Sequence, residues 1–385
     1  MTAVPRDEAA GSGEAEPGTV PVTSHESVTP SPGAAAANSA RRRMPVTQLG
    51  PAGPAVSRIG LGLAALGRPA YITSGRGGDL PDRSVAGMAA RTAEMLDAAY
   101  AMGITYFDAA RSYGRAEEFL GSWLSDRGLT RAEVSVGSKW GYRYTGDWQL
   151  DAPRQEVKEH SLAMFTTQLE QTRALLGDRL ALYEVHSLTA GSGLLDDPPL
   201  LAAIAALRAS GVLTGVTTSG PGQASALRRA LDATVDGQPV FCVAQVTWNL
   251  MEPSVGAAAA EAAAAGWTIL VKEALANGRL APGGDGAAAL SRATGLRGVP
   301  ALAGLVAATG DPGLPTDAVA IAAALANPWA GVVLSGAVTP GQLAANLRAL
   351  DILELVGLEF SGLGLPRLAE PAEAYWAARA ERPWQ

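Results

Sequence analysis

The fold of this chain is decided by the stretch GITYFDAARSYGRAE, which spans residues 103–117. A short apolar run ends in the carboxylate Asp108, Tyr113 follows five positions later, and a helical pattern begins after Gly114. This order predicts a strand, a loop and a helix start within one short segment. The loop can therefore hold an acid and a phenol side by side at the mouth of a parallel sheet.

The composition indicates a globular protein with one large domain or two ordinary ones. The chain has 385 residues, of which 48% are apolar and 17% charged, and a formal net charge of −7. The negative charge argues against nucleic acid or an anionic membrane surface as a partner. Because no run of 18 apolar residues occurs, we expect no membrane-spanning helix. The single cysteine, Cys242, excludes a disulfide framework and indicates a buried thiol.

Residues 1–44 differ in composition from the rest of the chain. They are rich in Ala, Gly, Ser, Thr and Pro, show no apolar periodicity and carry an arginine triplet at 41–43. Such a segment buries too little apolar surface to offset its ordering entropy, so we expect a disordered N-terminal extension. It lacks the apolar region of a secretory signal, which leads us to expect a cytoplasmic protein. The folded domain is predicted to span residues 45–385.

From residue 45 onward, strand-like and helical patterns alternate. Two short strand pieces around a Gly/Pro turn, 46–49 and 55–62, open the domain. Further strands are predicted at 104–107, 134–139, 181–186, 211–217, 241–246, 268–272 and 331–334. Helices are predicted at 85–102, 115–126, 158–176, 198–209, 222–233, 254–265, 316–326 and 340–352, with a tail helix at 367–380.

Eight strands that alternate with helices predict right-handed βαβ units and a parallel sheet. At this chain length they fit a closed (β/α)₈ TIM barrel, with a short N-terminal strand hairpin and a C-terminal tail helix. An open doubly wound sheet is the alternative. It is disfavoured because no G-x-G-x-x-G motif follows the first strand.

Four polar side chains fall at the carboxyl ends of neighbouring predicted strands. Asp108 follows the second strand, with Tyr113 on the loop beyond it, while Lys139 and His186 end the third and fourth strands. Active sites of such barrels lie at this end of the strands. We therefore expect the four side chains to converge.

The chemistry of this set follows from its charges. A phenol titrates near ~10, and a nearby lysine ammonium is expected to lower the pKa of Tyr113 by roughly 1–3 units. Asp108 would keep Lys139 charged, and His186 would orient a substrate oxygen. Tyr113 is then a general acid toward a carbonyl oxygen. Because the set has no thiol and no second histidine nearby, we expect hydride transfer from a bound cofactor and no metal.

These residues resemble the aldo-keto reductases. The likeness lies in residues 103–110 with Tyr113-Gly114 and Ala116-Glu117, in Ser138-Lys139 and in residues 182–186, and the similarity extends over roughly residues 45–355. It implies a (β/α)₈ barrel that binds NADP(H) in extended form. Tyr113 would be the proton donor, supported by the other three polar side chains.

The resemblance also implies cofactor-binding residues on the later strands. The implied set is Thr217, Thr218, Gln245, Lys272, Leu275, Ser335, Gly336, Ala337, Gln342 and Asn346. Lys272 stands where the family commonly has an aromatic that stacks on nicotinamide; it could reach a cofactor phosphate or pair with a neighbouring carboxylate. Val338 and Thr339 stand where a basic residue often contacts the 2′-phosphate. NADP(H) is still expected over NAD(H), and NADH use stays open.

The sequence says less about the identity of the substrate than about the reaction. Trp140 and Tyr142 follow Lys139 and are expected to line a pocket for a small carbonyl or alcohol. Packing of a long loop onto the rim would explain them equally well. Two other functions stay open: a nucleotide-binding sensor or subunit without turnover on the same fold, and a lyase that forms a Schiff base on Lys139.

Overall fold

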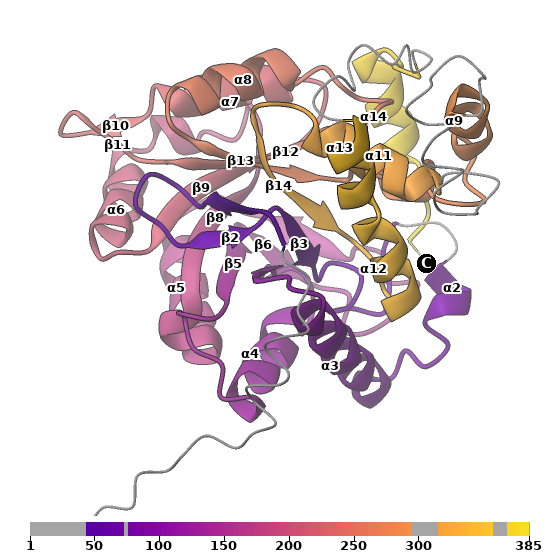
Figure 1. The fold of residues 1–385 in the computed structure, drawn as a ribbon. Helices are drawn as coiled ribbons and strands as arrows, with labels where there is room; N and C mark the ends of the chain where they lie inside the picture. The colour runs from indigo at the N-terminus through magenta and orange to yellow at the C-terminus, as the bar shows by residue number, and fades with distance from the viewer. Residues whose placement is uncertain (1–43, 73–75, 295–314, 357–367, 385) are drawn as a thin grey trace, which may run out of the picture. The chain divides into compact units, whose positions relative to one another are not determined.

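The computed structural model describes residues 44–72, 76–294, 315–356 and 368–384. Its centre is a closed barrel of eight parallel strands (Figure 1), as predicted. The strands are β3 (Ile59–Gly62), β4 (Tyr106–Asp108), β5 (Ser135–Trp140), β8 (Leu180–Leu188), β9 (Leu213–Thr218), β12 (Val243–Thr247), β13 (Thr268–Lys272) and β14 (Ala330–Ser335). Pairing of β14 with β3, with Val333 opposite Ile59, closes the ring. The predicted extension 1–44 lies outside the described residues, except for Met44.

Helices follow the strands and surround the barrel (Figure 1). They are α3 (Val85–Ala101), α4 (Ala116–Asp126), α5 (Leu162–Leu176), α6 (Pro198–Ala209), α7 (Gln223–Leu231), α8 (Gly256–Ala264), α11 (Thr316–Leu325), α12 (Pro340–Leu347) and α13 (Ala349–Val356). Several begin at a side-chain cap: Ser84, Ser161, Asp197 and Thr339 each accept a hydrogen bond from a backbone N–H in the first turn. These caps satisfy backbone N–H groups that would otherwise lack a partner at the helix starts.

The N-terminal hairpin closes one end of the barrel. It pairs β1 (Val46–Gln48) with β2 (Ala55–Ser57) in antiparallel register. Leu49 and Val56 are fully buried against the inward-facing side chains Tyr106, Leu182 and Leu270. The hairpin thus seals the amino ends of the strands, and chemistry is left to the carboxyl ends.

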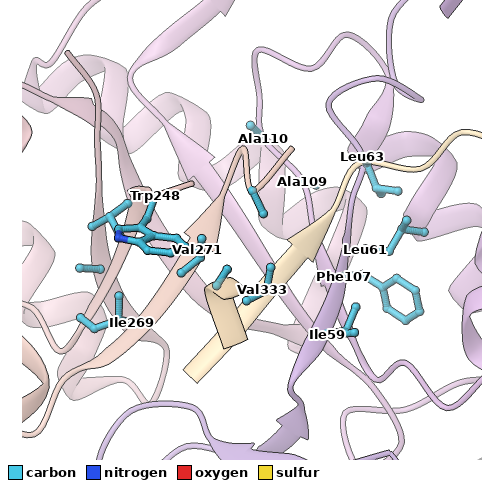
Figure 2. Packing of buried hydrophobic residues seen from close by; sticks show 14 of the residues in the cluster. Ile59, Leu61, Leu63, Phe107, Ala109, Ala110, Trp248, Ile269, Val271 and Val333 are labelled. Carbon is cyan, nitrogen blue, oxygen red and sulfur yellow. The ribbon is translucent and has the colours of Figure 1, made fainter. Parts of the chain in front are cut away.

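Successive strand residues face opposite sides of the barrel wall. Phe107 and Val136 pack outward against the helices, whereas Tyr106 faces inward. Figure 2 shows part of the outer cluster, with Leu61 and Phe107 among its members. Gly137 is required on the inner face, because a Cβ there would lie 2.1 Å from the Tyr106 hydroxyl.

The structure differs from the prediction in the connections. The segment predicted as a loop and the start of a helix at 158 instead forms an antiparallel hairpin, β6 (Tyr142–Tyr144) with β7 (Glu156–Lys158), so α5 begins only at Leu162. The predicted helix 340–352 is divided at Arg348 into α12 and α13. The tail helix α14 (Ala372–Ala380) begins directly after Pro371.

The remaining short elements were not predicted. They are α2 (Arg76–Asp79), the hairpin β10 (Thr234–Val235) with β11 (Gln238–Pro239), α9 (Ala287–Thr294) and the 3₁₀ turns η1 (Gly177–Arg179), η2 (Leu194–Asp196) and η3 (Ala276–Gly278). In the part of the chain that the structure describes, no helix has the length and apolar character needed to cross a bilayer.

Candidate active site

Strand alternation and one turn bring the predicted side chains to the barrel mouth. Asp108 ends β4, and Lys139 and His186 lie near the ends of β5 and β8. Beyond β4 the chain turns back, as Tyr113 N–H donates to the Ala110 carbonyl. Gly114 continues the turn with a φ of +60°, a backbone conformation that favours glycine.

The structure brings Asp108, Tyr113, Lys139 and His186 together; we call them the tetrad. The Lys139 ammonium is ion-paired with Asp108, both side chains are buried, and it also donates to the Ala109 carbonyl at 2.9 Å. Its Nζ lies 5.0 Å from the centroid of the Tyr113 ring. The rings of Tyr113 and His186 meet edge to face, with centroids 5.5 Å apart.

The expected net lowering of the Tyr113 pKa is wrong. Burial raises the pKa of Tyr113 well above its ordinary value, and the negative charge of Asp108 raises it further. The lysine charge is already paired with Asp108, which weakens its attraction for a phenolate. Tyr113 is therefore a neutral phenol that carries its proton, the form a general acid needs.

His186 is held as a neutral imidazole. Burial lowers its pKa well below the ordinary value, and the positive charges of Lys139 and Lys272 lower it further. Its Nδ1 lies 3.3 Å from Ser112 Oγ, and the Tyr142 ring packs on it with centroids 4.9 Å apart. A neutral, oriented ring can hydrogen-bond a carbonyl oxygen without competing for the proton of Tyr113.

A second buried carboxyl group lies below the tetrad. Gln245, predicted as a cofactor contact, directs its amide nitrogen into the barrel and donates to Asp108 Oδ1 at 2.9 Å and to Glu184 Oε2 at 3.1 Å. We did not predict a role for Glu184. Its position two residues before His186 places both side chains on one face of a strand, which could have indicated it.

The other predicted cofactor residues on β9 and β13 line the same end of the barrel. Thr217 Oγ1 accepts from the Ser187 N–H at 2.7 Å, and the Thr218 hydroxyl lies 3.4 Å from the amide oxygen of Gln223. Lys272 Nζ donates to Thr247 Oγ1 at 2.6 Å. Burial lowers the pKa of Lys272 to about 8, although Glu273 3.9 Å away opposes this. Leu275 is half-buried against the outer core.

The predicted residues at the end of β14 form a second cluster. Ser335 Oγ accepts from the Ala337 N–H at 3.2 Å and lies 2.8 Å from the Asn346 amide. Gln342 accepts from the Val338 N–H and donates to Asp79 of α2 at 2.8 Å. Gly336 is exposed, and a Cβ placed on it would meet no atom within 4 Å. The cluster therefore presents open backbone beside the N-terminus of α12.

The two residues predicted to line the pocket lie in different surroundings. Trp140 is 1% exposed and packs against Phe165, with ring centroids 5.0 Å apart, in the core between β5 and α5. The Tyr142 ring, in contrast, lies against His186. Only Tyr142 of the two is placed beside the tetrad, because the side chains of Lys139 and Trp140 point to opposite faces of β5.

A cationic side chain covers Tyr113, and sequence reasoning missed it. The Arg68 guanidinium lies 5.4 Å from the Tyr113 ring centroid and 4.6 Å from that of Trp384. It donates to Glu156 of β7 and to the Ser112 carbonyl, both at 2.9 Å. These partners come from three distant segments of the chain, which no local sequence pattern relates to Arg68.

The tail helix is fastened to the end of β13. Arg379 of α14 makes a two-fold ion pair with Glu273, and the Tyr375 hydroxyl lies 3.1 Å from Asn249 Nδ2. Glu273 adopts a φ of +58°, which is rare for a side-chain-bearing residue. Although burial raises the pKa of Glu273, the charges of Arg379 and Lys272 outweigh it and hold the pKa at about 2.

Replacing Arg379 by glutamine is expected to destabilise the fold by up to about 3 kcal/mol at neutral pH, because a buried carboxylate loses its partner. A depressed pKa contributes stability above the unfolded value of 4.5 and loses it as the pH falls toward about 2. Urea unfolding should thus show a difference from the native protein that shrinks below pH 4.5. A difference that does not vary with pH would contradict the charge argument, and Arg228→Gln, at an exposed ion pair, is the control.

The described domain is a (β/α)₈ barrel with the tetrad at the carboxyl ends of its strands. A model of the Aldo/keto reductase family matches residues 58–362. The chain belongs to the aldo/keto reductase family. Within the described ranges, no group of three or more His, Cys, Asp or Glu side chains is arranged to hold a metal ion.

Solved structures agree with this assignment. A Pseudomonas aeruginosa protein provisionally described as an aldo-keto reductase is 26% identical, with a TM-score of 0.55 over 80% of this chain and 95% of that one. An aldo-keto reductase of Bacillus halodurans in its holo form has a TM-score of 0.59 over 86% of this chain and 98% of that one. Its 20% identity shows the fold alone. A search among curated proteins gives no match.

Proposed function

We propose that this protein reduces the carbonyl group of a small molecule with NAD(P)H, with Tyr113 as the proton donor. The observation that carries the proposal is the neutral, buried phenol between the Lys139–Asp108 ion pair and the His186 ring. The cofactor, when bound, supplies a hydride to the carbonyl carbon. Tyr113 supplies the proton to the carbonyl oxygen, and the reverse transfers would oxidise an alcohol.

Each remaining member of the tetrad has a role that its surroundings support. His186 is neutral and fixed by Ser112, so it can orient the carbonyl oxygen toward the phenol. Lys139 provides a positive charge 5.0 Å from the Tyr113 ring centroid, where negative charge develops as the proton leaves. Asp108 holds the ammonium in place. The tight cover of Tyr113, which is 8% exposed, excludes water from this transfer.

The donor groups present suit an anionic dinucleotide. The exposed backbone at Gly336 lies beside the positive dipole end of α12, which suits a phosphate group. Lys272 adds a cationic group at the end of β13. We place the nicotinamide near Thr217, Thr218 and the tetrad, and the adenosine end near Ser335, Gln342 and Asn346.

A titration with NADPH and NADH tests the cofactor assignment. We expect both to bind, with affinities within about tenfold of each other, because no basic side chain stands at positions 338 and 339 to favour the 2′-phosphate. The Asp79 carboxylate lies against Gln342 and should repel a 2′-phosphate. Asp79→Asn should therefore tighten NADPH and leave NADH unchanged in a calorimetric titration. An equal change for both cofactors would contradict this placement of the adenosine end.

The ion pair weakens the lyase alternative. A Schiff base needs a free amine that a substrate can reach, whereas Lys139 is fully buried and its Nζ is bonded to the Asp108 carboxylate and the Ala109 carbonyl. We further propose that the protein acts in the cytoplasm on a small carbonyl or alcohol, without nucleic acid or membrane as a partner. Its negative net charge supports this proposal.

A further inference from the structure

A fully buried carboxyl group, Glu184, lies beneath the tetrad and has no part in the mechanism given above. The register of the barrel sets it beside Lys139 of β5 on one side and Gly215 of β9 on the other. A Cβ on Gly215 would come within 3.2 Å of Glu184 Cγ. The missing side chain at position 215 leaves room for the glutamate.

One amide nitrogen joins Glu184 to the tetrad. The nitrogen of Gln245 donates to Glu184 Oε2 and to Asp108 Oδ1, while the second oxygen of Asp108 pairs with Lys139. Among the described residues, Glu184 Oε1 has no hydrogen-bond partner. Two carboxyl groups thus converge on one amide, and an ammonium is bonded to Asp108. Like charges this close in a dry interior do not both ionise, so the pair retains a proton.

The groups around Glu184 indicate which carboxyl carries that proton. Titratable side chains face it from β5 (Lys139), β4 (Asp108 and Tyr106), β13 (Lys272) and its own strand (His186). The neighbours on β9 and β12, Gly215, Thr217 and Gln245, do not titrate. Burial raises the pKa of Glu184 well above its ordinary value; Lys139 opposes the rise and Asp108 adds to it. Asp108 has the Lys139 ammonium as its partner and Glu184 has only the shared amide, which favours Glu184 as the carboxyl group that keeps the proton.

We propose that Glu184 is a positioning residue for the reduction, a neutral acid that leaves Asp108 as the carboxylate paired with Lys139. The inference rests on the proposed function. When Tyr113 gives its proton to the carbonyl oxygen, the phenolate is stabilised by the Lys139 ammonium. An ionised Glu184 would place a second negative charge beside Lys139 and oppose the phenolate. Reduction should therefore slow as the pH rises through the pKa of Glu184.

The variant Glu184→Gln separates charge from structure. Glutamine keeps an acceptor for the Gln245 amide and imitates the neutral acid, but it cannot ionise. We expect near-native kcat/KM at acidic pH and a shift of the alkaline decline of kcat/KM to higher pH. An unchanged pH profile, or a folded variant inactive at every pH, would overturn the proposal.

Glu252→Gln is the matched control for that profile. Glu252 is also fully buried, accepts from an amide nitrogen, that of Gln223, at 3.2 Å and has one carboxyl oxygen without a partner, but it lies on the loop after β12. A merely structural role for a buried glutamate would alter thermal unfolding in both variants. Only Glu184→Gln is expected to shift the alkaline decline of kcat/KM to higher pH.

A second measurement does not depend on activity. Infrared spectra of the wild-type protein at neutral pH should contain the C=O stretch of a buried carboxylic acid, and labelling glutamate with ¹³C should shift it. The band should be absent from Glu184→Gln and present in Glu252→Gln. No such band, or a band insensitive to the label because Asp108 holds the proton, would overturn the inference. If the protein reduces carbonyl groups but its spectrum lacks the band, the inference about Glu184 is wrong and the proposed function stands. The band in a protein that reduces no carbonyl contradicts the proposed function and the role built on it, while the protonation of Glu184 stands.

Discussion

Tyr113→Phe should lower kcat for carbonyl reduction by about 10²–10⁴-fold, the usual contribution of a general acid. The ring, its contact with His186 and its packing under Arg68 are kept, so the Kd for NADPH should change little. Only the proton of the phenol is lost. Steady-state kinetics on an aldehyde panel and a fluorescence titration with NADPH measure the two quantities separately.

Tyr183→Phe provides the control for this result. Tyr183 lies on β8 beside Glu184 and is also buried, but it faces the outer core, where its hydroxyl is 3.5 Å from Thr172. Loss of that hydroxyl should leave kcat near the native value. Near-native turnover in Tyr113→Phe would exclude the phenol as the proton donor. Loss of both turnover and NADPH binding would point to a damaged fold, which circular dichroism would detect.

Lys139→Met should be the most damaging single change to both stability and turnover. Methionine leaves the Asp108 carboxylate buried without its ammonium, and removing one partner of a buried ion pair costs about 3–5 kcal/mol. The developing phenolate on Tyr113 would also lose its nearest positive charge. Guanidinium unfolding and steady-state kinetics check the two effects.

A double variant identifies the cause of the stability loss. Adding Asp108→Asn to Lys139→Met removes the uncompensated charge, so part of the lost stability should return while turnover stays low. No recovery would mean that packing, not charge, explains the loss. Arg228→Met, at the exposed pair with Glu261, should shift the unfolding midpoint little.

The barrel could be predicted because its determinants are local. The strand predicted at 268–272 matches β13 residue for residue, since a buried apolar run bounded by polar residues identifies it. The helix after Tyr113 was also placed to within one residue. The β6–β7 hairpin could not be predicted in this way. It is held by backbone pairing between Tyr142 and Lys158 across a long connection, and its three-residue strands carry no strong periodicity.

The candidate site was predictable only in part, for a related reason. The strand-end rule brings Asp108, Lys139 and His186 to one rim, and the structure places them there. The direction of the Tyr113 pKa depends instead on burial, to which residues distant in the chain contribute. Arg68, near the start of the domain, lies over Tyr113 and also contacts Trp384 at the other end of the chain. A prediction from the charges on neighbouring strands alone therefore gave the wrong direction for the shift of the Tyr113 pKa.

The stacking of Trp384 on Arg68 makes the tail an intrinsic optical reporter of the barrel mouth. An indole within 4.6 Å of a guanidinium carbon changes its emission when that contact opens or when the local field changes. The chain has eight tryptophans. Subtracting the emission of Trp384→Phe from that of the native protein would isolate the signal of Trp384 from that of the other seven. Stopped-flow mixing with NADPH could then follow any change around the Arg68–Trp384 contact without a label.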